Sequence, residues 1–489
     1  MEHRELCGLK ILNKTKIVCT LGPASRSQDV IKKMFDAGMS GVRINTAYGD
    51  TSQYERVIES VREIGEIPII VDVKGPEIRI KAKKRTLHEG EIFEAGFNGQ
   101  EISFNWDFYD KIDTGDIILI DNGRVKTQVA EKTDRTLRLK VISGGEIANG
   151  KGVNVPKKQL AVPTLSKKDK EMIQFAKKSD VDYIALSFTR NVQDVSNLRA
   201  EAGGFSGAVI AKIENSEGIN NFAEILGCSD GIMVARGDMG VEIEPEKVPL
   251  VQKSIIKACN QKGKPVITAT EMLESMMQQP TPTRAEVSDV ANAILDGTDA
   301  TMLSGETAVG KYPVEAVAMM SRIATEAEKA TRSQVEEEGF INISDAVSKA
   351  VQRICHTMPI NKVVTLTRSG YTARAIARFK ISQPIIAVTP YEKVKRQLEL
   401  VFGVYPAKIN YREQKDHILH VANGLYSMNM ITEEDTVLFT AASRTLTKHS
   451  SNLIEIHKIE ELRKYNRDHE QQSTKIADTC GKRESARGH

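Results

Sequence analysis

The feature that most constrains the fold of this chain is a regular alternation of short apolar segments with longer amphipathic ones. Eight segments have the composition of buried strands: residues 15–21, 41–45, 67–74, 182–187, 208–213, 231–235, 265–270 and 300–304. Helical patterns follow them, for example at 245–262 and 313–329. Apolar strands separated by helices indicate a parallel sheet that is buried on both faces. Eight such units over roughly 250 residues predict a (β/α)8 barrel, with an open doubly wound sheet as the alternative.

A segment of different character interrupts this alternation after the third strand. Residues 75–163 contain short strand patterns joined by Gly, Asp-Gly and Asn-Gly turns, and they contain no long helical pattern. Turns of this kind join antiparallel strands, so the segment predicts a small β domain inserted into the barrel. The barrel itself is therefore expected from residues 1–74 and 164–335.

The last third of the chain has a second, shorter alternation. A polar stretch at 330–344 is typical of a linker, and residues 345–456 again alternate strand and helix patterns, which predicts a smaller α/β domain with a parallel sheet. Residues 457–489 are polar and indicate the end of a helix followed by a tail.

Composition excludes several classes of function. The 489 residues carry a net charge of only +3, which does not favour a nucleic-acid partner, and no apolar run is long enough to cross a membrane. The first ten residues lack the apolar segment of a signal peptide. Six scattered cysteines with no CxxC spacing indicate reduced thiols, so we expect a cytoplasmic protein.

Polar and charged side chains cluster where the predicted strands end. They occupy residues 43–45, 72–74, 187–188, 212–215, 236–238, 268–271 and 304–306. Each could form an ordinary surface ion pair when it is considered alone. In a (β/α)8 barrel, however, the active site lies at the carboxyl ends of the strands, so these tips meet around one opening. The sequence therefore predicts a charged active site there.

Within this set, Glu214 and Asp238 are candidate ligands for Mg²⁺ or Mn²⁺, because two carboxylates leave coordination positions for substrate and water. Lys212 lies two residues before Glu214 on a strand and points to the same face. A lysine beside a metal-binding carboxylate can neutralise a phosphoryl oxygen, and Arg43 offers a fork-shaped donor for phosphate. In the C-terminal domain, residues 367–373 follow a strand and open a helix, which indicates either a phosphate site or an ordinary helix cap.

Several ordered motifs resemble the pyruvate kinase family from about residue 14 to 450. They are TKIVCTLGPAS (15–25), VKGPEIR (73–79), KGVNVP (151–156), AKIEN (211–215), ARGDMGVE (235–242), TEMLESM (270–276), the run 282–317 and TRSGYTARAIARF (367–379). The resemblance implies a barrel, an inserted β-barrel lid and a C-terminal α/β domain. It also implies glycolytic transfer of the phosphoryl group of phosphoenolpyruvate to ADP, which gives pyruvate and ATP.

The same resemblance implies roles for individual residues. The phosphoryl group would be held by Arg43 and Lys212, and the Mg²⁺ by Glu214 and Asp238. Ser187 would line the substrate pocket, and the carboxylate would be bound by Gly237, Asp238 and Thr270. The nucleotide, which carries a second Mg²⁺, would be bound by Arg79 and Asn45. Thr270 would also lie near the carbon that is protonated. Asn45, Asp72 and the Val73 carbonyl would bind K⁺, and Thr367, Ser369 and Thr372 would form an effector site. By analogy with the family, we expect a homotetramer.

This chain departs from the family pattern at a few positions. Ala47 replaces the usual serine of the K⁺ site and Tyr48 replaces a histidine near the nucleotide, whereas Glu77 is the acid that K⁺-dependent members carry. We therefore expect that K⁺ still activates. The usual sugar-bisphosphate loop is missing at residues 440–444, so a monophosphate effector or none is expected rather than fructose bisphosphate.

Two other functions compete with this prediction. A Mg²⁺-dependent barrel lyase that forms an enolate of pyruvate or oxaloacetate would share Glu214 and Asp238 but would need no nucleotide lid. A sensor of phosphorylated metabolites with decayed catalysis is suggested by Ala47 and Tyr48. The inserted domain and Arg79 argue against the lyase, and the intact Lys212 argues against the sensor.

Overall fold

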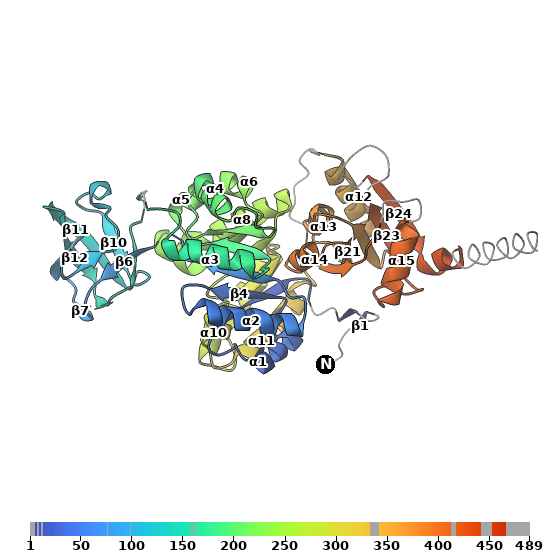
Figure 1. Ribbon diagram of the computed structural model, residues 1–489, viewed down its shortest axis with the longest axis horizontal. Helices are drawn as coiled ribbons and strands as arrows, with labels where there is room; N and C mark the ends of the chain where they lie inside the picture. The colour runs from blue at the N-terminus through green and yellow to red at the C-terminus, as the bar shows by residue number, and fades with distance from the viewer. Residues whose placement is uncertain are drawn as a thin grey trace, which may run out of the picture. The chain divides into compact units, whose positions relative to one another are not determined.

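The computed structural model describes residues 5–6, 9–10, 13–75, 77–97, 99–156, 158, 160, 162–332, 342–411, 417–441 and 452–465. The chain divides into two compact units. One unit spans residues 16–329, and the other combines residues 1–15 with residues 330–489. Figure 1 shows the helices and strands of both units along the chain.

The larger unit contains a closed barrel of eight parallel strands, as the alternating pattern predicted. The strands are β3 (Lys16–Leu21), β4 (Gly41–Asn45), β5 (Ile69–Val73), β15 (Tyr183–Leu186), β16 (Ala208–Ile213), β17 (Gly231–Ala235), β18 (Val266–Ala269) and β19 (Ala300–Leu303). They follow one another around the barrel in chain order, and β19 closes the circle by pairing with β3. The (β/α)8 prediction is confirmed, and the alternative of an open sheet is wrong.

Helices surround this barrel. They are α1 (Gln28–Ala37), α2 (Thr51–Ile64), α3 (Lys167–Lys178), α4 (Val192–Glu201), α5 (Ser216–Asn220), α6 (Phe222–Cys228), α7 (Arg236–Glu242), α8 (Val248–Lys262), α9 (Arg284–Leu295), α10 (Gly305–Ala308) and α11 (Pro313–Ala327). Polar residues fix where several of them begin. Ser166 and Asp169 form a reciprocal capping box at the start of α3, and Thr283 and Glu286 do so at α9, so main-chain donors of the first turn are satisfied.

Strand periodicity decides which side chains line the interior of the barrel. On β16, Val209, Ala211 and Ile213 belong to the apolar core that the strands share with the helices. Because successive side chains on a strand point to opposite faces, Lys212 points to the interior. The same alternation on β5 places Asp72 inside, between Val71 and Val73 in the helix-facing core. The apolar residues on either side of Asp72 and Lys212 pack against the helices, so these two charged side chains point into the interior of the barrel.

The insertion is a second barrel built from short strands. Its strands are β6 (Ile78–Lys81), β7 (Arg85–Leu87), β8 (Ile92–Gly96), β9 (Ser103–Phe104), β10 (Ile117–Ile120), β11 (Val125–Thr133), β12 (Thr136–Ser143), β13 (Gly145–Ile147) and β14 (Gly152–Asn154). Seven of them close in the order β10-β11-β12-β8-β9-β6-β14, while β7 pairs with β13. A separate apolar core fills this domain.

The second unit contains a five-stranded sheet with helices on both faces. Its elements are α12 (Ile343–Thr357), β20 (Lys362–Leu366), α13 (Tyr371–Ala377), β21 (Ile385–Thr389), α14 (Glu392–Leu398), β22 (Val404–Lys408), α15 (His417–Ser427), β23 (Thr436–Ala441) and β24 (Leu453–Lys458). Strands β22, β21, β20 and β23 are parallel, in that order. α12, α13 and α14 contribute to the core on one face and α15 to the core on the other.

The edge strand β24 runs antiparallel to β23 and was not predicted. It extends to Lys458, so the first two residues of the polar tail expected from residue 457 belong to this strand. The remainder of that tail, 466–489, lies outside the described residues. Cys19, Cys228, Cys259 and Cys355 are free thiols, whereas the other two cysteines fall outside the described part of the chain. Among the described residues, no helix has both the length and the apolar character needed to cross a membrane.

Candidate active site

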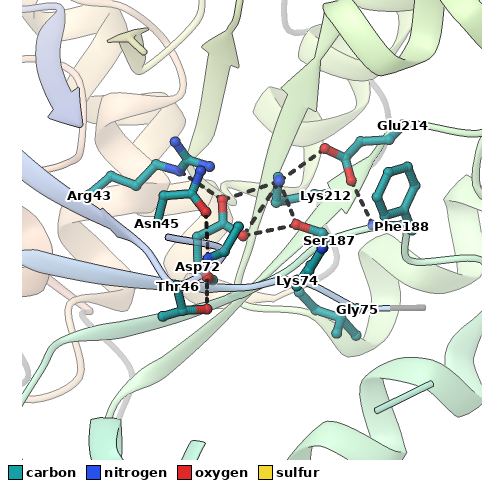
Figure 2. Close-up of polar contacts among 12 residues, drawn as sticks. Arg43, Asn45, Thr46, Asp72, Lys74, Gly75, Ser187, Phe188, Lys212 and Glu214 are labelled. Atoms are coloured by element: carbon teal, nitrogen blue, oxygen red, sulfur yellow. Dashed lines mark hydrogen bonds and ion pairs between the residues drawn. The ribbon is translucent and has the colours of Figure 1, made fainter. Parts of the chain in front are cut away.

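Four predicted site residues form one hydrogen-bonded cluster at the carboxyl ends of neighbouring barrel strands (Figure 2). Arg43 Nε donates to Asp72 Oδ2 over 2.7 Å, and the Ser187 hydroxyl donates to Asp72 Oδ1 over 2.9 Å. Lys212 Nζ lies 2.6 Å from Ser187 Oγ and 3.1 Å from Asp72 Oδ2. All four side chains are buried. The register of β4 against β5 pairs Arg43 with Ile70, two residues before Asp72, so the long Arg43 side chain reaches forward to the carboxylate.

Glu214 joins this cluster from the other side of the lysine. Its Oε1 atom lies 3.0 Å from Lys212 Nζ, and its Oε2 atom accepts a hydrogen bond of 2.6 Å from the main-chain N–H of Phe188. Phe188 has a φ of 53°, in the left-handed region. In Figure 2 the lysine amine lies between Asp72 and Glu214. The ammonium group is thus held between two acids from different strands.

The charges of the cluster oppose the cost of burial. Burial alone would raise the pKa of Asp72, but Lys212 and Arg43 together hold it below its usual value. Burial would likewise lower the pKa of Lys212, but Asp72 and Glu214 raise it above its usual value. Asp72 is therefore kept ionised and Lys212 protonated, which gives the site a fixed positive group beside a fixed negative one.

Glu214 and Asp238 behave differently. Burial, reinforced by the neighbouring acids, raises the pKa of Glu214 to about 7, and Lys212 only partly offsets this. Burial also raises the pKa of Asp238, with Glu77 and Asp72 adding to the effect. Two buried carboxylates whose pKa values are raised are a donor set that a divalent cation would stabilise. Among the described residues no group of three or more His, Cys, Asp or Glu side chains could hold a metal ion.

Thr270 and Gly237 are also brought together. The Gly237 N–H donates to Thr270 Oγ1 over 2.8 Å, and that hydroxyl donates to the Ala269 carbonyl over 2.6 Å. Thr270 lies just past β18, Gly237 just past β17, and Asp238 follows Gly237 in α7. Asp238 contributes to the electrostatic balance of both Glu214 and Lys212, which places it within interaction range of the cluster.

The residues expected at the nucleotide and K⁺ sites each have partners of their own. Arg79 on β6 pairs with Glu77 over 2.8 Å and contacts the Gly150 carbonyl, so it belongs to the inserted domain. Asn45 Oδ1 accepts from the Ala47 N–H over 3.1 Å. The Val73 carbonyl accepts from the Ser187 N–H over 3.2 Å.

The expected effector residues lie in the second unit, between β20 and α13. Thr367 Oγ1 accepts from the Gly370 N–H over 3.0 Å, and both Thr367 and Thr372 are buried, whereas Ser369 is exposed. Of the loop at residues 440–444, which we expected to differ from the sugar-bisphosphate loop, residues 442–444 lie outside the described residues.

Sequence reasoning gave no role to two residues that support the site, although it counted Arg236 among the charged strand tips. Thr20 on β3 accepts from Arg43 Nη1 over 3.1 Å, and its inward position follows from strand alternation, which could have identified it. Arg236 is buried and donates to the Thr270 and Glu271 carbonyls. Nothing in the sequence pattern indicates those partners, because they depend on how the chain turns after β18.

Buried cations beside a pair of carboxylates at the open end of a (β/α)8 barrel suit a phosphotransferase, because phosphoryl transfer depends on placed cations and a metal site rather than on a covalent nucleophile. Comparison with known proteins gives the family. Family models described as "Pyruvate kinase, barrel domain" and "Pyruvate kinase, alpha/beta domain" match residues 12–317 and 345–457. The chain belongs to the pyruvate kinase family.

Individual relatives agree with this assignment. Pyruvate kinases of Sporosarcina psychrophila and of a bovine strain of Staphylococcus aureus are each 41% identical, over 92% and 91% of this chain and 81% and 80% of theirs. A crystal structure of a pyruvate kinase from Cryptosporidium parvum superposes with a TM-score of 0.84 at 34% identity, covering 92% of this chain and 96% of that one. These comparisons support neither the lyase nor the sensor.

Proposed function

We propose that the cluster around Lys212 carries out the phosphoryl transfer from phosphoenolpyruvate to ADP. The observation that carries this proposal is the burial and pairing of Lys212, which is only 6% exposed. Its ammonium group contacts Asp72, Glu214 and Ser187. Arg43 pairs with the same aspartate. Two fixed cations at the open end of the barrel suit a phosphoryl group whose oxygens carry negative charge in the transition state. Lys212 would lie nearest the transferring phosphorus, and Arg43 would orient its oxygens.

Glu214 and Asp238 would hold the Mg²⁺ or Mn²⁺ that pyruvate kinases need. Their raised pKa values, caused by burial among other acids, make them a donor set that favours a bound cation. When bound, the metal ion supplies positive charge for the phosphate, carboxylate and enolate oxygens of the substrate. Glu214 would keep Lys212 and the Phe188 N–H as partners while it held the metal ion.

The remaining substrate contacts follow from the Thr270 turn. The Gly237 and Asp238 amides and the Thr270 hydroxyl would bind the carboxylate of phosphoenolpyruvate, and Ser187 would line the pocket. Thr270 would also direct a proton, through water, to the carbon that becomes the methyl group of pyruvate. Its hydroxyl is held from two sides, by the Gly237 amide and the Ala269 carbonyl, which supports a fixed orientation.

The nucleotide would bind between the barrel and the inserted domain, which lie in one unit. Arg79 and Asn45 would contact its phosphates, and a second Mg²⁺ would accompany ADP. Asn154 of β14 donates to Glu242 at the end of α7 over 2.9 Å, so the inserted domain is already connected to the helix that carries Asp238. This connection supports a lid that excludes water when both substrates are bound.

K⁺ would bind the Asn45 amide oxygen, the Asp72 carboxylate and the Val73 carbonyl. The Asn45 amide oxygen and the Val73 carbonyl each accept a main-chain N–H, the Asp72 carboxylate is shared by Arg43, Ser187 and Lys212, and Ala47 supplies no side-chain oxygen. We expect activity to fall when choline replaces K⁺ in the assay. Equal activity in the two salts would contradict this proposal.

Thr367, Ser369 and Thr372 would bind the phosphate of an effector in the C-terminal domain. Without the usual loop for a second phosphate, a sugar monophosphate is the expected ligand, and strong activation by fructose bisphosphate would contradict this. We also propose a homotetramer in the cytoplasm, by analogy with the family. Light scattering on the purified protein tests the homotetramer, because a molar mass different from that of four chains would exclude it.

A coupled assay tests the proposed reaction. The purified chain, supplied with phosphoenolpyruvate, ADP and Mg²⁺, should form pyruvate only when ADP is present, in a one-to-one ratio with ATP. Decarboxylation of oxaloacetate or turnover independent of ADP would favour the lyase. Binding of phosphoenolpyruvate without any turnover would favour the sensor.

A further inference from the structure

Arg236 is a buried charged residue to which the roles above give no task. It directly follows β17 and is only 6% exposed. Its guanidinium contacts main chain and side chains of three other segments. Nε and Nη2 donate to the Thr270 carbonyl over 3.2 and 2.8 Å, and Nη2 also donates to the Glu271 carbonyl over 2.8 Å. An arginine that binds two successive carbonyls fixes the path of the chain between them.

The chain path at this point is unusual. Thr270 and Glu271 have φ values of 67° and 52°, in the left-handed region. For a β-branched residue such as Thr270 this conformation costs roughly 1–3 kcal/mol and persists only where the surroundings enforce it. The two carbonyls of these residues are the ones that Arg236 binds, so its guanidinium offsets the cost of the turn.

The turn has a direct consequence for the Thr270 side chain. With the main chain held in this conformation, Thr270 Oγ1 accepts from the Gly237 N–H over 2.8 Å. Gly237 is the next residue after Arg236, so one short segment binds Thr270 at both its carbonyl and its hydroxyl. A change at the carbonyl contact would therefore reorient the hydroxyl.

Arg236 is itself anchored from outside the site. Its Nη1 atom pairs with Asp289 on α9 over 2.5 Å and lies 3.5 Å from Gln252 Oε1 on α8. These two contacts leave Nε and Nη2 for the carbonyls. The guanidinium thus connects two outer helices to the turn that carries Thr270.

We infer that Arg236 is a positioning residue for the reaction: it fixes the Thr270 hydroxyl by holding the Thr270–Glu271 turn in its left-handed conformation. This inference rests on the proposed role of Thr270 in proton transfer. It requires donors on separate atoms of a planar group that reach two carbonyls and an acid together, whereas a lysine carries all its donors on one nitrogen.

The test measures proton exchange at the methyl group of pyruvate. With Mg²⁺ and ATP in D₂O, a methyl C–H bond breaks, its proton goes to solvent, and a C–D bond forms with a solvent deuteron, so the methyl signal in the proton NMR spectrum decays. For Arg236→Lys we expect exchange and kcat to fall about 10–100-fold, since small misplacements of a catalytic group have effects of this size. The KM for ADP and the Kd for Mn²⁺ should change less than twofold.

Arg62→Lys is the matched control. Arg62 binds two main-chain carbonyls, those of Ile67 and Asp180, and pairs with Asp182 over 3.0 Å, but it does so before strands β5 and β15, at the amino end of the barrel. This variant should lose stability while its exchange rate stays that of the wild type. Asp289→Asn keeps Arg236 and weakens only its anchor, so it should show the same signature as Arg236→Lys at about a third to a tenth of the size. If Arg236→Lys does not fold, the Asp289→Asn variant provides the test in its place.

Two results would overturn the inference. One is wild-type exchange in both Arg236→Lys and Asp289→Asn, and the other is a loss of Mn²⁺ binding in parallel with exchange, which would indicate general disruption. Thr270→Val separates the inference from the role on which it rests. If exchange is slow in Thr270→Val but normal in the Arg236 and Asp289 variants, only the inference fails; if it is normal in Thr270→Val, the proposed role of Thr270 fails.

Discussion

The two ends of the larger barrel use the same kinds of residues in opposite ways. At the amino end, Asp182, Asp230 and Asp299 each directly precede a strand and accept a main-chain N–H near the start of the neighbouring strand, over 3.0, 2.8 and 3.0 Å. At the carboxyl end, Asp72 is bound to cationic and hydroxyl side chains of other strands, whereas Glu214 pairs with Lys212 and accepts the Phe188 N–H. The first arrangement satisfies main-chain donors, and the second gathers charge.

This difference shows which end is built for stability and which for chemistry. An aspartate that accepts an otherwise unpaired strand amide stabilises the barrel. A buried acid whose pKa is raised to about 7, as burial and neighbouring acids do to Glu214, costs stability in the absence of a cation. Sites that cost folding free energy in this way are where function is expected.

The largest effect is expected at the carboxyl end. Glu214→Gln removes one proposed metal-binding carboxylate and leaves Lys212 with Asp72 as its acidic partner. We expect kcat/KM to fall about a thousandfold, which corresponds to the several kcal/mol that a metal ion contributes in the transition state. Steady-state kinetics and Mn²⁺ titration should both show the loss, while stability without metal should not fall. Retained Mn²⁺ affinity would remove Glu214 from the metal site.

An intermediate effect, on stability alone, is expected at the amino end. Asp182→Ala leaves the Ile69 amide and Arg62 without this fully buried partner. Removing one member of a buried ion pair costs about 3 kcal/mol in the free energy of unfolding. Denaturant unfolding should show this loss, and kcat should stay within twofold of the wild type. A large loss of kcat in a folded variant would break the distinction between the two ends.

The smallest effect concerns pH. Glu306 accepts the Leu273 and Ser304 amides at the carboxyl end, and burial raises its pKa above the usual value near 4.5. A carboxyl group with a raised folded pKa stabilises the fold fully below its unfolded pKa and loses that contribution as pH rises through the folded pKa. The stability advantage of the wild type over Glu306→Gln should therefore shrink from pH 4 upward in metal-free protein. An advantage that grows with pH would contradict the direction of this shift.

Sequence reasoning went furthest where a pattern has a fixed period. The spacing of apolar segments gave the eight barrel strands, and the two-residue spacing of Lys212 and Glu214 placed both on one face, where they contact each other. Strand tips bring residues together in any barrel, so the cluster at the carboxyl end could be expected before its distances were known.

Contacts that depend on local backbone geometry could not be predicted. The partners of Arg236 arise from a left-handed turn at Thr270, a residue type that rarely adopts it. The direction of β24 was equally hidden, because an apolar alternation is the same for parallel and antiparallel strands. Both are decided by packing rather than by pattern.

The central claim is that Lys212 acts on the phosphoryl group during its transfer. Rapid-quench measurement of a single turnover, with phosphoenolpyruvate labelled at phosphorus, ADP and Mg²⁺, tests it most directly in the wild type and in Lys212→Met. The chemical step should slow by roughly a thousandfold or more, as for other cations that stabilise a transferring phosphoryl group, while the Kd for Mn²⁺ changes little. An unchanged chemical step in a folded Lys212→Met enzyme would contradict the claim.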